Sequence, residues 1–177
     1  MRDLEYTTTP HQRNILIQRI NSFFKDGNIF KIGILYLLID TPLSLIFSKL
    51  EELGIPNIHF HETIDKYNFS FEKELLLTVF FGPFVETVIF QFLPYVILSR
   101  ISYLKKNPVY IILISTLLFG LTHNYSVHYI IYGMIPGAFY IYLYIMRTGK
   151  HPFYTVFILH AVNNLVCIIL DKIFPDI

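Results

Sequence analysis

Long apolar runs, separated by short polar segments, dominate the chain. Five runs approach the roughly 20 residues that a helix needs to cross a hydrocarbon core of about 30 Å. They cover residues 30–47, 75–98, 109–122, 127–146 and 153–170. Apolar residues are continuous within each run and do not alternate with polar ones, which favours helices over barrel strands. The pattern predicts an all-α, polytopic membrane bundle with about five transmembrane helices.

The first 29 residues are more polar than the rest of the chain. Four apolar residues recur there at helical spacing, among basic residues: Leu16, Ile20, Phe23 and Phe24. This spacing predicts an amphipathic helix lying in the cytoplasmic interface of the membrane, with an irregular tail as the alternative. Residues 30–177 then form the membrane-embedded bundle, and no linker divides it.

Composition and charge narrow the class of protein. Hydrophobic residues make up 54% of the 177 residues and charged residues 15%, against about 25% charged in soluble domains. A net charge of +1 offers no basic surface for nucleic acid. The single cysteine, Cys167, excludes a disulfide framework and a cysteine zinc cluster. The chain is therefore expected to be an integral membrane protein whose partner is the lipid bilayer.

Basic residues distribute unevenly between the two sides of the predicted bundle. With the N-terminus inside, four of the 14 Lys and Arg residues lie outside: Lys49, Lys66, Lys73 and Lys172. The others lie inside, as the positive-inside rule expects. We therefore predict the cytoplasmic membrane as the location and a cytoplasmic N-terminus.

Acidic residues inside the apolar runs point to chemistry or to helix pairing. A carboxylate at the bilayer centre costs about 2.5–3.5 kcal/mol, and Glu86 lies midway along the second run. Pro83 lacks an amide hydrogen, so the helix is expected to bend there and open space beside Glu86. Asp40 precedes Pro42 in the first run, where we expect a structural role at a bend.

Two histidines lie in other runs. His123 follows the third run, and His160 shares a helix face with Asn164, four residues on. Glu86 and the two imidazoles, meeting inside the bundle, could activate water and stabilise an oxyanion. Two structural alternatives stay open: an interfacial His123, and a Glu–His pair that only joins helices.

Three segments resemble the motifs of the CPBP family of intramembrane proteases, the CAAX prenyl proteases and bacteriocin-processing enzymes also known as the Abi family. The family pattern is EExxxR, FxxxH and HxxxN or HxxxD. The chain reads Glu86-Thr-Val-Ile-Phe-Gln91, Phe119-Gly-Leu-Thr-His123 and His160-Ala-Val-Asn-Asn164 within a core of about residues 75–170. The resemblance implies an intramembrane endopeptidase acting on a peptide or protein, including lipid-modified ones.

The resemblance also implies roles for individual residues. Glu86 corresponds to the glutamate that activates water, His123 to the histidine that works with it, and His160 with Asn164 to the oxyanion or metal pair. Among cofactors, a divalent metal such as zinc is the one candidate, with Glu86, His123 and His160 as donors of suitable type. Metal-dependent and metal-free mechanisms both stay open.

The first motif departs from the family pattern at two positions. Thr87 replaces the second glutamate and Gln91 replaces the arginine, so that both ends of an ion pair become neutral together. We expect these supporting residues to hydrogen-bond across one helical turn. Two alternatives to a protease remain: a catalytically silent bacteriocin-immunity or peptide-binding protein, and a small transport or scaffold protein.

Overall fold

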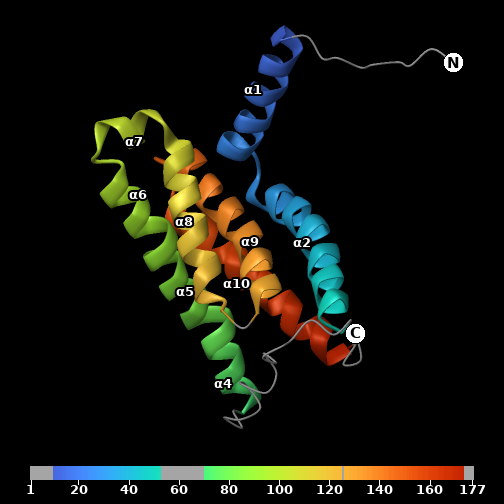
Figure 1. Ribbon diagram of the computed structural model, residues 1–177. Coiled ribbons are helices and arrows are strands. Elements are labelled where there is room, and N and C mark those ends of the chain that lie inside the picture. The colour runs from blue at the N-terminus through green and yellow to red at the C-terminus, as the bar shows by residue number, and fades with distance from the viewer. Residues whose placement is uncertain (1–9, 53–69, 125, 174–177) are drawn as a thin grey trace, which may run out of the picture.

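The computed structural model describes residues 10–52, 70–124 and 126–173, and these ranges contain helices and no strands. The long helices run side by side in Figure 1, and α1 lies beyond the end at which α2 begins. Apart from the irregular helix Phe71–Leu98, which is described below, the helices are α1 (Pro10–Asp26), α2 (Ile29–Glu52), α7 (Ser102–Lys106), α8 (Pro108–Thr122), α9 (Val127–Met146) and α10 (Pro152–Ile173). The predicted all-α membrane bundle is confirmed.

Within the described ranges, four helices are long and apolar enough to cross a membrane. These candidate spans are Ile29–Phe47, Phe71–Leu98, Val127–Met146 and Pro152–Ile173. The remaining predicted run corresponds to α8, which is apolar but has only 15 residues. At 1.5 Å per residue, α8 covers about 22 Å, less than the hydrocarbon thickness. By its length, α8 therefore falls short of a full crossing.

The helix Phe71–Leu98 alternates between α-helical and π-helical segments. It consists of α4 (Phe71–Leu75), η1 (Leu76–Phe81), α5 (Gly82–Glu86), η2 (Thr87–Phe92) and α6 (Leu93–Leu98). Each π segment ends two residues before a proline, at Pro83 and at Pro94. Since proline cannot donate to the carbonyl four residues earlier, a wider turn ahead of it relieves the clash. The irregularity expected at Pro83 thus takes the form of π turns within a continuous helix.

Small residues let α8 and α9 pack closely. A Cβ atom built on Gly137 would lie 2.9 Å from the ring of Phe119, and one on Gly120 would lie 2.9 Å from the carbonyl oxygen of Ile130. Both positions lack room for a side chain. This close approach places Phe119 and the end of α8 against α9.

The helix α1 packs beside the turn between α9 and α10. The ring of Phe24 meets that of Tyr142 edge-to-face at 5.4 Å, Arg147 donates to the carbonyl of Gly27, and Lys150 pairs with Asp26. Four apolar side chains of α1 are exposed: Ile15, Leu16, Ile17 and Ile20. Such a helix suits the interfacial position, which stays a prediction; residues 1–9 of that segment lie outside the described residues.

Candidate active site

Glu86 and His160 face each other inside the bundle. Glu86 ends α5 and His160 lies in the first half of α10, with 3.6 Å between Oε2 of the carboxylate and Nε2 of the imidazole. Oε2 is buried and has no hydrogen bond within the described part of the chain. A distance of 3.6 Å is too long for a direct hydrogen bond, and it brings the two groups close enough to interact electrostatically.

Aromatic rings hold the His160 imidazole in place. The ring of Tyr140, from α9, stacks on it with 4.7 Å between centroids and 28° between planes. The ring of Phe119, from α8, meets it at 5.9 Å. Tyr140 is not among the site residues predicted from sequence. The sequence feature that could have identified Tyr140 is its position on the same face of α9 as Gly133 and Gly137, which pack against α8.

His123 lies where α8 ends and packs into the bundle. Its Nδ1–H donates to the carbonyl oxygen of Phe119 at 2.8 Å, and its ring lies 4.7 Å from that of Phe119. A Cβ on Gly133 would lie 3.2 Å from this imidazole, so glycine makes room for it. Phe119 therefore contacts both imidazoles. With Nδ1 donating, Nε2 of His123 carries a free lone pair.

Asn164 ties α10 to the helix that carries Glu86. Its Nδ2 donates to the carbonyl oxygen of Thr78 in η1, at 2.9 Å. One hydrogen of this amide is thereby used, and the second is left for another acceptor. The bond aligns the two segments on which Glu86 and His160 lie.

The supporting pair of the first motif differs from the expectation. Thr87 and Gln91 are fully buried, but the hydroxyl of Thr87 and both amide atoms of Gln91 form no hydrogen bond within the described residues. The predicted bond between them is wrong. Both residues lie in η2, whose i→i+5 geometry takes residues four apart out of the alignment they have in an α-helix.

The predicted metal donors do not gather into a metal site. Across the ranges 10–52, 70–124 and 126–173, no three side chains of His, Cys, Asp or Glu lie in an arrangement that could hold a metal ion. Glu86 and His160 form a pair, and His123 is engaged with Phe119 instead. This arrangement does not fit zinc bound by the three residues.

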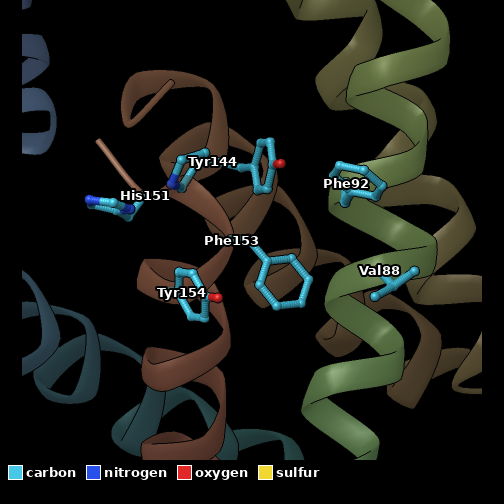
Figure 2. Close-up of a pocket in the computed structure, with 7 residues that line it drawn as sticks. Val88, Phe92, Tyr144, His151, Phe153 and Tyr154 are labelled. Atoms are coloured by element: carbon cyan, nitrogen blue, oxygen red, sulfur yellow. The ribbon is translucent and has the colours of Figure 1, made fainter. Parts of the chain in front are cut away.

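An apolar cleft of about 370 Å³ lies further along the same helix. In Figure 2, Val88 and Phe92 project from this helix toward Phe153 and Tyr144 across the cleft. The lining residues are Val88, Phe92, Tyr144, His151, Pro152, Phe153 and Tyr154. None of the predicted site residues lines it. Its volume lies within the range of small-molecule sites.

Comparison with protein families identifies the family of this chain. The family model described as type II CAAX prenyl endopeptidase Rce1-like matches residues 70–166, which is more than half of the chain. The chain belongs to this family of prenyl endopeptidases. The match contains Glu86, His123, His160 and Asn164, whereas α1 and α2 precede it. No curated protein and no solved structure matches the chain.

Membership of the Rce1-like family agrees with the fold and with the resemblance seen in the motifs. The chain is a CAAX-type protease of the membrane, and its substrates are peptides or proteins. The apolar helices make it an integral membrane protein. In this endopeptidase the Glu86–His160 pair lies within the family-matched segment, beside the aromatic rings of α8 and α9.

Proposed function

We propose that the chain hydrolyses peptide bonds within the membrane by means of a water molecule that Glu86 activates. The observation that carries this proposal is the separation of 3.6 Å between the Glu86 carboxylate and His160 Nε2, with Oε2 otherwise without a hydrogen bond in the described residues. The Glu86 side chain keeps 30% of its surface exposed, while its Oε2 atom, which faces His160, is buried.

The reaction begins with proton transfer to Glu86. The carboxylate takes a proton from the water while the water oxygen attacks the carbonyl carbon of the scissile bond. Attack produces a tetrahedral intermediate with a negative oxygen. When the C–N bond breaks, the leaving nitrogen receives the proton, and an acid and an amine are released.

Two side chains of α10 stabilise the oxyanion in this proposal. His160 presents Nε2 at the reaction centre, and Asn164 retains one amide hydrogen after its bond to Thr78. Donors fixed before the reaction are effective because they need no reorganisation when charge develops. The ring of Tyr140 and the carbonyl of Thr78 supply this fixation.

His123 positions the water and shuttles its proton. The free lone pair on Nε2 can accept a proton, since Nδ1–H is used by the carbonyl of Phe119. The ring of Phe119 contacts both imidazoles, at 4.7 Å from that of His123 and 5.9 Å from that of His160 between centroids. No metal takes part in this scheme, because the three candidate donors do not gather.

The apolar cleft at Val88 and Phe92 supports a lipid-modified substrate. Val88 and Phe92 lie two and six residues beyond Glu86 on the same helix, a rise of about 3 Å and about 9 Å along its axis, so an apolar group held there stays close to the catalytic carboxylate. We assign the cleft to the lipid part of the substrate, with the peptide reaching toward Glu86.

The test is hydrolysis of a farnesylated peptide with a C-terminal CAAX sequence by the full chain in liposomes. Mass spectrometry of the peptide termini identifies the cut. We expect Glu86→Gln to lower the rate by about 100-fold or more, because the amide cannot take the proton.

A matched control is Glu74→Gln, on the same helix. Glu74 forms an ion pair with Lys172 at 3.6 Å, near the end of the helix remote from the cleft. This variant should cut at the native rate. If the native chain binds the peptide and leaves it intact, the peptide-binding or immunity alternative replaces the protease.

A further inference from the structure

Asp40 is a buried carboxylate outside the family-matched segment. It lies in α2 with 2% of its surface exposed, and no other acidic side chain of the described residues is buried to this extent. An unpaired carboxylate at this depth would be costly in a membrane, so its neighbours reveal its role.

Three polar side chains surround this carboxylate. Tyr132, from α9, donates its hydroxyl to Oδ2 of Asp40 at 3.2 Å. Asn163, from α10, and Tyr36, one turn earlier in α2, face the same carboxylate. Both are buried, with 7% and 5% of their surfaces exposed. Asp40 thus joins α2 to the two helices that build the site around His160.

Two short series of contacts connect Asp40 with His160. Asn163 lies on α10 between His160 and Asn164, so holding its amide holds this turn of the helix. In the second series, the ring of Tyr36 lies 5.5 Å from that of Tyr140, which stacks on His160 at 4.7 Å.

Several of the residues that connect Asp40 with His160 also carry polar atoms without a hydrogen-bond partner among the described residues. Of the buried polar atoms without a partner in the described part of the chain, four belong to residues along these two connections: Tyr36 Oη, Asp40 Oδ1, Tyr140 Oη and His160 Nδ1. They come from α2, α9 and α10, the helices that Asp40 joins. Buried polar atoms of this kind normally find partners, and here the neighbouring groups can supply one another.

We propose that Asp40 is a positioning residue of the endopeptidase. Its carboxylate holds Asn163 and the Tyr36–Tyr140 pair, and thereby directs the His160 imidazole toward Glu86. This inference rests on the proposed function, and it extends the active site to a helix that the family match does not include.

The test is Asp40→Asn in the full chain, reconstituted in liposomes with the farnesylated CAAX peptide. Asparagine keeps the shape and an oxygen that accepts from Tyr132, but it loses the charge and one acceptor. We expect kcat to fall about tenfold with KM nearly unchanged, because a misdirected imidazole impairs the chemical step. Ser44→Ala is the matched control, one turn along α2, where the hydroxyl bonds only the carbonyl of Thr41 among described residues.

A second variant covers the case in which Asp40→Asn does not fold. Tyr132→Phe removes only the hydroxyl that donates to Asp40, and should lower kcat of the folded protein by about threefold, together with a lower melting temperature from the lost hydrogen bond. Native kcat in whichever of the two variants folds overturns the proposal. A kcat loss that is fully explained by a lower folded fraction also overturns it.

An independent measurement separates this inference from the proposed function. The ¹⁵N resonance of the His160 imidazole is measured in detergent and assigned by its loss in His160→Gln. It should shift in whichever of Asp40→Asn and Tyr132→Phe folds, and it should not shift in Ser44→Ala. An unchanged resonance overturns the positioning role, even if the native chain proves inactive. An inactive native chain with a displaced resonance contradicts only the proposed function.

Discussion

At the residue scale, the site depends on the packing of its two imidazoles as much as on the polar groups. His160 is stacked on Tyr140, and His123 occupies the space that Gly133 leaves. Since effective catalysis needs side chains within a fraction of an ångström of the productive geometry, small changes beneath these rings should affect the rate.

Gly133→Ala tests this dependence. The added methyl would lie 3.2–3.3 Å from atoms of the His123 side chain, so the imidazole must move by a few tenths of an ångström. We expect hydrolysis of the farnesylated peptide to fall about tenfold, with a stability loss of about 1–3 kcal/mol from overpacking.

Gly149→Ala serves as the control for lost stability. Gly149 has φ of 86°, so alanine is strained there, but no atom lies within 4 Å of the added Cβ. The strain costs about 1–2 kcal/mol without displacing either imidazole. Equal losses of activity in the two variants would mean that Gly133 acts only through stability.

At the element scale, the irregular helix Phe71–Leu98 and α10 form one unit. The π segment η1 presents the carbonyl of Thr78 to Asn164, and α5, which follows, presents Glu86 to His160. On α10 the two contacting residues, His160 and Asn164, are four positions apart, whereas their partners Glu86 and Thr78 are eight positions apart. The register between the helices is therefore set by Asn164 together with the π turns.

Asn164→Leu removes this tie while keeping a similar volume. The carbonyl of Thr78 loses its side-chain donor in the membrane interior, which costs about 1–3 kcal/mol. We expect a lower melting temperature in detergent together with a lower rate of hydrolysis. Asn107→Leu is the matched control, because Asn107 makes a similar 2.9 Å bond to the carbonyl of Tyr103 at an exposed corner. A melting temperature lowered equally by both changes would contradict a stabilising role of the hydrogen bond from Asn164 to the carbonyl of Thr78.

At the scale of the whole molecule, polar contacts attach α1 to the end of the bundle at which α9 turns into α10. Lys150 pairs with Asp26, and the hydroxyl of Tyr142 donates to Asn21 at 2.8 Å. The Lys150 hydrogen bond, with the charges of Lys150, Lys25 and Arg147, holds the pKa of Asp26 below its ordinary value of 3.8.

The lowered pKa of Asp26 predicts the pH range in which α1 detaches from the α9–α10 turn. Because the pKa is lowered in the folded chain, the attachment is present above pH 3.8 and is lost as the pH falls through the lower folded value. The effect on overall stability should be small, since the pair is exposed to solvent. Spin labels on α1 and on the α9–α10 turn should separate at low pH, and Asp26→Asn should loosen the attachment at neutral pH. A constant label distance in all of these conditions would contradict this role of the pair.

Much of the architecture follows from the sequence alone. Helix spans depend on the length of apolar runs, which is a local property, so four predicted runs correspond to candidate spans. The motif spacing likewise identifies Glu86 and His160, which the fold then brings to 3.6 Å. The regular pattern of proline and apolar residues does not by itself distinguish a bend from the π turns η1 and η2.

The tertiary structure alone decides which side chains meet across helices. Tyr140 meets His160 across consecutive helices, while Asn164 against the carbonyl of Thr78 and Tyr132 against Asp40 join helices far apart in sequence. Each contact depends on the rotation of one helix relative to another, and a π turn changes that rotation for every residue after it. Local sequence determines the helices and the chemical groups that they carry, while the packing of the bundle determines which of those groups form a site.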